Sequence, residues 1–386
     1  MVIVRAVRLT DLDQLWQLIE QATYGLTTLQ INKDQLAERV ELSNFAFTRK
    51  TEKATGEPYV LVMEDVSHGK LVGLSCIFSK TGGYEPFYSY RRVVETNHCE
   101  LLGTTQVVES LHLEKIHDGP TEIGSLFLLP EYRQQGRGRL LSLARFAFMA
   151  AHPKRFSEVV IAEMRGVLSD NGECPFWEAI GRHFFNMDFP QADSLSTINK
   201  RFIEDLMPKY PIYTSLLPES GREILGKVHP QTVPALTMLQ AEGFVIDNLI
   251  DIFDGGPVVR CRRDEINAVK RTMTTRVAAI VHRQDGDPQI LASTDNGFRA
   301  MIGPVQLSDS GATISEVEAL TLQLKVGDAL RILSLHPSCA PVCPSVPRRS
   351  AVAIPCAPDH LAGLETLQEE IATAERRGTL STSCCR

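Results

Sequence analysis

A short loop at residues 133–138, Arg-Gln-Gln-Gly-Arg-Gly, contains the residue types best suited to chemistry in this sequence. Its glycines permit a tight turn in which backbone N–H groups converge. An apolar run at 121–129 precedes it, and a helical pattern follows from Gly138 to His152. The start of a helix offers free N–H donors and positive dipole charge, to which the arginines add. The spacing therefore predicts a strand–loop–helix unit that binds an anion such as a phosphate.

The same loop also suits a simpler interpretation, a surface turn before an amphipathic helix that carries arginines. The six residues alone do not separate the two interpretations. Their position favours the anion site, because the loop follows an apolar strand and opens a long helix.

Other segments predict the elements that must position this loop. Two runs, at 59–64 and 71–78, are joined by a short turn and are expected to form an antiparallel hairpin. Further strands are expected at 2–7, 121–129, 159–164 and 245–253, and helices at about 11–22, 32–42, 138–152 and 232–242. This alternation of strands and helices predicts an α/β (α+β) fold.

The chain has 386 residues, enough for two or three domains. Residues 1–255 hold the loop, with an insertion at about 166–226 whose aromatic residues and prolines suggest short helices and ordered loops that build a pocket wall. A Gly-Gly-Pro turn then leads into a shorter, β-rich segment at 256–335, expected as a small domain. Residues 336–386 hold five of the nine cysteines and six of the 21 prolines, so this tail is expected to lack a core of its own.

Composition narrows the function classes. The net charge of −7 argues against a general nucleic-acid binder, which would usually be basic. No run of 18 apolar residues predicts a membrane span, and the N-terminus has no signal-peptide pattern, so a cytoplasmic protein is expected. Cys339 and Cys343 form a CxxxC pair without a second pair at zinc spacing, so no metal site is predicted.

The loop and the order of elements resemble the GNAT acyltransferase superfamily. Its acyl-CoA-binding signature is an Arg/Gln-x-x-Gly-x-Gly/Ala loop, whose defined positions are occupied here by Arg133, Gly136 and Gly138. The resemblance implies a mixed central sheet and a loop that binds the CoA diphosphate. It also implies a preceding strand that bonds the pantetheine arm and directs an N–H at the thioester oxygen, where negative charge grows during attack.

Longer blocks resemble one family with this fold, the arginine N-succinyltransferases. The blocks are AEMRG at 162–166, PFWEAIGRHFFNMDF at 175–189, MPKYPIY at 207–213, KVHPQTVPA at 227–235 and IDIFDGGP at 250–257. The resemblance covers about 1–335, and the tail departs from it. It implies transfer of succinyl from succinyl-CoA to the α-amine of L-arginine, in arginine catabolism to glutamate and succinate. Succinyl-CoA is then a co-substrate, no permanently bound cofactor is expected, and the chain is expected to form a homo-oligomer or to pair with a paralogous subunit.

The resemblance also implies the roles of individual residues. His229 of the HPQT motif corresponds to the family's proton donor. The residues implied to bind succinyl-CoA are Leu126, Leu128, Arg133, Gln134, Gly136, Arg137 and Gly138.

His229 also suits its implied role on chemical grounds. Its ordinary pKa, about 6.5, lets an imidazole move protons near neutral pH, where the amine must lose one and the CoA sulfur must gain one. It precedes a helix expected from Thr232, so the residues alone favour a plainer role in which the imidazole caps local backbone.

Alternatives remain open at this stage. The acceptor could be ornithine, the donor could be another acyl-CoA, or the chain could be a non-catalytic subunit. Glu163, Arg165, Asp188, Asp251 and Asp254 suit a site for arginine, but structural ion pairs and turns are the expected roles of these residues.

Overall fold

A large mixed β-sheet organises the protein. The computed structural model describes residues 1–22, 32–50, 52–83, 85–169, 172–196, 200–294 and 297–335, all of which belong to one compact unit. The strand order is β14-β15-β11-β16-β12-β13-β1-β2-β3-β6-β7-β10-β9-β4-β5-β8. Neighbouring strands are antiparallel except for the pairs β6–β7 and β11–β15. The predicted α/β class is confirmed.

The strands are β1 Val2–Ala6, β2 Pro58–Asp65, β3 Lys70–Phe78, β4 Phe87–Cys99, β5 Thr104–Ile116, β6 Thr121–Leu128, β7 Val159–Glu163, β8 Ile212–Tyr213, β9 Val245–Ile250, β10 Pro257–Arg262, β11 Met273–Val281, β12 Pro288–Ser293, β13 Arg299–Pro304, β14 Gln306–Ser308, β15 Gly311–Ser315 and β16 Ala329–Leu333. The helices are α1 Leu12–Glu20, α2 Lys33–Thr48, α3 Arg137–Ala151, α4 Pro175–Ala179, α5 Gly181–Phe185, α6 Phe189–Ser196, α7 Arg201–Leu206, α8 Glu219–Ile224, α9 Val233–Ala241, α10 Asn267–Arg271 and α11 Glu316–Leu322. The predicted β2–β3 hairpin and the predicted strand–loop–helix unit, β6 followed by α3, are both present.

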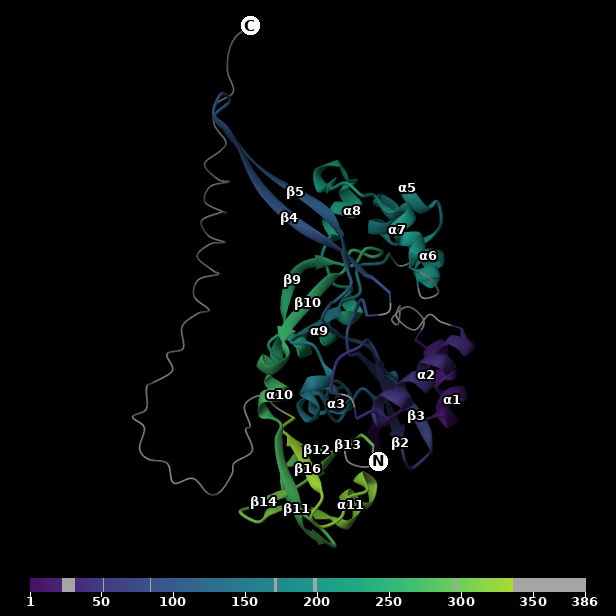
Figure 1. Ribbon diagram of the computed structural model, residues 1–386, viewed down its shortest axis with the longest axis vertical. Coiled ribbons are helices and arrows are strands. Elements are labelled where there is room, and N and C mark those ends of the chain that lie inside the picture. Colours follow the sequence, from purple (N-terminus) through teal and green to yellow (C-terminus); the bar gives the residue numbers. More distant parts are fainter. Residues whose placement is uncertain are drawn as a thin grey trace, which may run out of the picture. The chain divides into compact units, whose positions relative to one another are not determined.

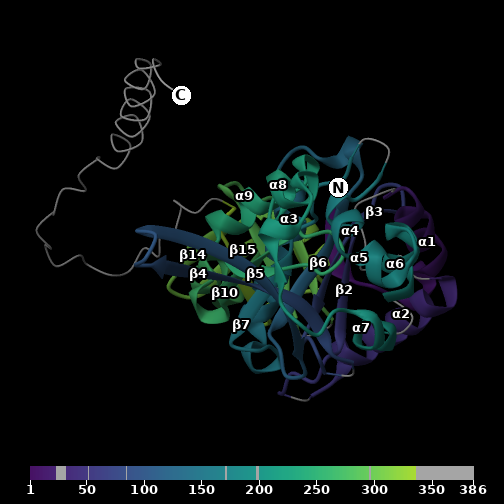
Figure 2. The same ribbon diagram turned by 90° about the horizontal axis from the view of Figure 1, so that it is seen from above.

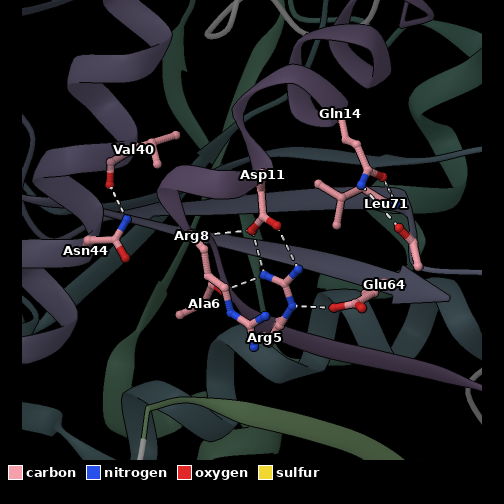
Figure 3. Close-up of polar contacts among 10 residues, drawn as sticks. Arg5, Ala6, Arg8, Asp11, Gln14, Val40, Asn44, Glu64 and Leu71 are labelled. Atoms are coloured by element: carbon pink, nitrogen blue, oxygen red, sulfur yellow. Dashed lines mark hydrogen bonds and ion pairs between the residues drawn. The ribbon is translucent and has the colours of Figure 1, made fainter. Parts of the chain in front are cut away.

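The first strand is tied to its neighbours through one buried arginine (Figure 3). The Arg5 guanidinium donates to both carboxylate oxygens of Asp11, at 2.6 and 2.9 Å, and to Glu64 on β2. Asp11 also accepts from the backbone N–H of Arg8. Since Arg5 is only 4% exposed, these charge-assisted bonds compensate its burial and fix the start of α1 against the sheet.

A long hairpin, β4–β5, is the largest element that the sequence patterns did not predict (Figure 1). Most residues near its tip are exposed. Such strands need no continuous apolar run, and that run is the pattern by which a buried strand is predicted from sequence. At its base, Tyr88, Tyr90 and Leu111 pack against the short helices of the 166–226 segment. Those helices, α4 to α8, lie close together (Figures 1 and 2). They share one apolar core that contains the buried Trp177. An insertion at 166–226 stays a prediction.

The segment after Pro257 is β-rich, as predicted. Its first strand, β10, pairs with β7 and β9, while β11 to β16 enclose a separate apolar core with α11. A domain boundary near residue 255 stays a prediction. The tail at 336–386, with Cys339 and Cys343, lies outside the described residues.

None of the helices in the described ranges is long and apolar enough to span a membrane.

Candidate active site

A cavity of about 1050 Å³ opens where β6 and β7 separate. The two parallel strands pair only through Thr121 with Val160 and Glu122 with Ile161. Beyond these pairs β6 continues to Leu128, and its residues line the cavity opposite Ala162 to Arg165. Because the ladder stops there, backbone groups of β6 that would serve a neighbouring strand are available to a ligand.

β6 is also irregular on its other side. Its pairing with β3 shifts register between Gly124 and Phe127, and Ser125 between them has a left-handed backbone with φ of 52°. Such a conformation is costly for a residue other than glycine and concentrates at functional sites. The bulge lies in the cavity wall, where Ser125 and Leu126 are both lining residues.

The arginine–glycine loop closes one end of the cavity. Gln135 and Gly136 adopt left-handed conformations in succession, with φ of 56° and 73°, and α3 begins at the next residue. No side chain caps this helix, and its first turn holds no acidic residue. The amides of Gly138 and Arg139 have no acceptor among the described residues. The loop therefore has the free donors and dipole charge that an anion site requires.

The predicted coenzyme-binding residues divide into two groups. Leu126, Leu128, Arg133 and Gly138 line the cavity. Arg133 is oriented by a bond from its Nε to the Leu128 carbonyl oxygen, 2.9 Å long. Gln134, Gly136 and Arg137 belong to the same loop but are not lining residues of the described cavity. The Arg137 guanidinium instead lies over the Tyr132 ring, 5.2 Å from its centre, and donates to Gln135.

His229 lies beside the cavity rather than in its wall. Its backbone N–H donates to the Arg165 carbonyl oxygen at 2.8 Å, and its neighbours Gln231 and Thr232 are lining residues. Its Nδ1 accepts the Gln231 N–H at 3.2 Å, so the imidazole does cap local backbone. Burial, and then the positive charge of Arg165, lower the pKa of His229. This geometry favours a neutral ring whose hydrogen is on Nε2, available for donation.

Carboxylates gather at the other end of the cavity. Glu122, Glu163, Asp251 and Asp254 all line it. Burial raises the pKa of each carboxyl group, and for Glu163 and Asp254 the neighbouring charge of Asp251 raises it further. An end of this kind attracts a cation, which would relieve the repulsion among the acids.

The four acids differ in how they are engaged. Asp251 accepts the amides of Phe253 and Asp254, and Asp254 accepts that of Gly256, so both hold the turn after β9. Asp254 also accepts the amide of Gly166, which ties this turn to the segment after β7. The carboxylates of Glu122 and Glu163 make no hydrogen bond or close ion pair within the described ranges, although the positive charge of Lys200 opposes the rise in the pKa of both, and that of Arg39 does so for Glu122. Glu122 is 9% exposed, and its Oε1 lies 3.6 Å from the position that a Cβ on Gly124 would occupy.

The sequence patterns do not single out Glu122, and they favour a structural role for Glu163. Their position at a strand start and a strand end was a signal, but only the pairing register shows that the two meet. In the described part of the chain, no group of three or more side chains is arranged to hold a metal ion.

Comparisons with known proteins agree with one another. The chain matches the family profile described as "Arginine N-succinyltransferase beta subunit" over residues 2–268. It is 40% identical to the arginine N-succinyltransferase of Photorhabdus laumondii, over 87% of this chain and 99% of that protein. It is 36% identical to the protein of the same name from an Escherichia coli strain, over 87% and 98% of the two chains.

A solved structure is similar as well. It is the arginine/ornithine succinyltransferase subunit AI from Pseudomonas aeruginosa, with a TM-score of 0.79 and 30% sequence identity. The alignment covers 87% of this chain and 99% of that one.

Proposed function

Since the chain belongs to the arginine N-succinyltransferase family, we propose that it transfers succinyl from succinyl-CoA to the α-amine of L-arginine. The products are N2-succinyl-L-arginine and CoA, as in arginine catabolism. The observation that carries this proposal is a single cavity with an anion-binding loop at one end and carboxylates at the other. These two ends suit the diphosphate of the donor and the cationic side chain of the acceptor.

The donor is proposed to lie along β6. The free amides at the start of α3 and the Arg133 guanidinium would hold the CoA diphosphate, and Gln134, Gly136 and Arg137 would shape the loop. The pantetheine arm would take the backbone groups of β6 that β7 leaves unpaired, near Leu126 and Leu128. The gap between parallel strands and the loop before α3 support the GNAT-like fold that the sequence resembles.

The acceptor is proposed to enter from the acidic end. A guanidinium offers five N–H donors in a planar fork, which suits carboxylates without other partners. Glu122 and Glu163 meet this condition, while Asp251 and Asp254 add negative charge behind them. Binding of the cation would favour the ionised carboxylates, whose pKa values burial raises.

The reaction forms a C–N bond and breaks the thioester C–S bond. The neutral α-amine attacks the thioester carbon, and backbone N–H groups at the β6 bulge stabilise the negative charge that grows on its oxygen. His229 is proposed to donate a proton from Nε2 to the departing sulfur, and the proton lost by the nitrogen restores the imidazole.

Ornithine is a second candidate acceptor, because the similar Pseudomonas protein is named for both amino acids. Ornithine presents an ammonium instead of the longer guanidinium, and the same acidic end could hold either cation. A product assay by mass spectrometry, with succinyl-CoA and equal amounts of arginine, ornithine and lysine, separates these candidates.

We also propose that the chain works in an oligomer, with copies of itself or with a related subunit. The family profile and the similar structure are both named as subunits. The tip of the β4–β5 hairpin exposes Leu101, Leu102 and Val107, which are 93%, 71% and 66% exposed, and such a tip suits a partner chain. A cytoplasmic location fits the free thiols of Cys76, Cys99, Cys174 and Cys261.

Thiol release from succinyl-CoA by the purified chain, measured with and without arginine, tests the proposed activity. Release that depends on arginine, with succinylarginine as the product, supports a self-sufficient enzyme. Release that is absent in both conditions contradicts it and favours the interpretation as a non-catalytic subunit.

A further inference from the structure

A buried arginine in the cavity wall lacks the carboxylate that its charge requires. Arg145 lies in the third turn of α3 and is 2% exposed. Its Nε and Nη2 donate to the carbonyl and hydroxyl oxygens of Ser142, within the same helix. No carboxylate pairs with it in the described part of the chain, and burial lowers the pKa of its guanidinium to about 10. A buried charge left in this state is costly, so a site of this kind is normally completed by an anion.

The position of Arg145 along α3 indicates which anion this is. Gly138, Leu141 and Arg145 follow one face of the helix, and all three line the cavity. At 1.5 Å per residue, Arg145 lies about 10 Å farther from the anion-binding loop than Gly138. With the diphosphate of the donor at the loop, its acyl end would lie on this far side.

The other cations of the cavity have different surroundings. Arg133 belongs to the loop end and bonds to Leu128. Arg165 is influenced by the negative charges of Asp254 and Asp193. Arg145 is therefore the cavity-lining arginine of the described residues that is neither in the loop nor influenced by a carboxylate.

We propose that Arg145 binds the free carboxylate of the succinyl group and so selects dicarboxylic acyl-CoA donors. The proposal rests on the proposed function and assigns its donor specificity to one side chain. Nη1, which makes no hydrogen bond within the described ranges, would donate to the carboxylate. A neutral acyl chain of the same length would leave the guanidinium unpaired and would bind less well.

The test compares succinyl-CoA with butyryl-CoA, which has the same four-carbon chain without the carboxylate. Equilibrium affinities are measured by calorimetry on the full chain and on its Arg145→Met and Arg145→Lys variants, and kcat/KM is measured with arginine. The native chain should prefer succinyl-CoA by at least about 100-fold in kcat/KM. Arg145→Met should lose about 100- to 1000-fold with succinyl-CoA and stay within about threefold with butyryl-CoA. Arg145→Lys should keep part of the preference, because it retains the charge.

Thermal unfolding without ligand distinguishes a binding role from a structural role. Arg145→Met removes an unpaired buried charge, so its Tm should equal or exceed that of the native chain. A lower Tm together with equal losses for both donors would show a packing role and overturn the proposal. Equal affinity of the native chain for both donors would also overturn the proposal, as would an Arg145→Met variant in which only the KM for arginine rises.

The calorimetric measurement needs no turnover. A succinyl-dependent affinity that Arg145→Met removes supports the proposal even in a chain without activity, whereas missing thiol release counts against the proposed function instead.

Discussion

Glu122 on β6 and Glu163 on β7 project from the same face of the sheet, at the point where the two strands part. Glu122 pairs with Ile161, and Glu163 follows two residues later, so the alternation of side chains places both on one face. Both line the cavity, and neither has a hydrogen-bond partner in the described part of the chain. This pair of carboxylates is the feature that best explains how a cationic acceptor would be held.

Substitution of Glu163 should weaken binding of the acceptor and leave binding of the donor unchanged. Glu163→Gln keeps the shape and removes the charge that a guanidinium would meet. The KM for arginine should rise about 10- to 100-fold, while the affinity for succinyl-CoA should stay within about twofold. Initial-rate kinetics with each substrate varied in turn measure both. Glu178→Gln, at an exposed surface ion pair with Arg182, is the matched control and should change neither.

His229 should matter for turnover rather than for coenzyme affinity. His229→Ala should lower kcat by about two to four powers of ten and leave succinyl-CoA affinity largely intact. Since burial and Arg165 lower the pKa of His229, the limb that it contributes to the pH–rate profile should lie below pH 6.5. That limb should be missing in the variant.

A second His229 variant separates catalysis from capping. Asparagine is a good N-cap and can accept the Gln231 N–H as the imidazole does. His229→Asn should therefore recover the Tm of the native chain without recovering kcat. Recovery of full activity by asparagine would show that the cap alone matters.

The loop glycine at 136 should be required for coenzyme binding. Gly136 has φ of 73°, so Gly136→Val strains the backbone and places a branched side chain beside the free amides of α3. Succinyl-CoA affinity should fall by more than about tenfold in calorimetry. Gly69 has a similar φ of 60°, lies in the β2–β3 turn and has no atom within 4 Å of an added Cβ. Gly69→Val should cost similar stability and leave affinity unchanged, and equal affinity losses in both variants would reject the phosphate site.

Asp193 should make stability depend on pH. It is 5% exposed, its Oδ2 has no partner in the described residues, and burial raises its pKa to about 8. The unfolded chain ionises this group near pH 4, so ionisation favours unfolding progressively between about pH 4 and pH 8. Asp193→Asn should raise Tm by an amount that grows across this window and is constant above it. A gain in Tm that is the same at pH 4 and pH 8 would contradict this assignment.

Local patterns predicted the elements around the site well. The apolar run before the loop became β6, and the glycines and helical spacing after it marked the start of α3. The β2–β3 hairpin followed from two apolar runs and a short turn. These features depend on residues close in the sequence, whose periodicity and turn propensity can be assessed without knowledge of distant contacts. The β4–β5 hairpin was not predicted, because its exposed tip carries no apolar run that would mark a strand.

The sequence by itself determined the class of fold, the loop of arginines and glycines before a helix, and the family resemblance, because each depends on residues that are neighbours in the sequence. Only the tertiary structure decided that β6 and β7 stop pairing after two residues and leave a cavity between them. It also decided that Glu122 meets Glu163, that Arg145 is buried without a carboxylate, and that His229 bonds to the Arg165 segment. These relations join residues tens of positions apart, and strand register and helix packing, rather than local preference, set them.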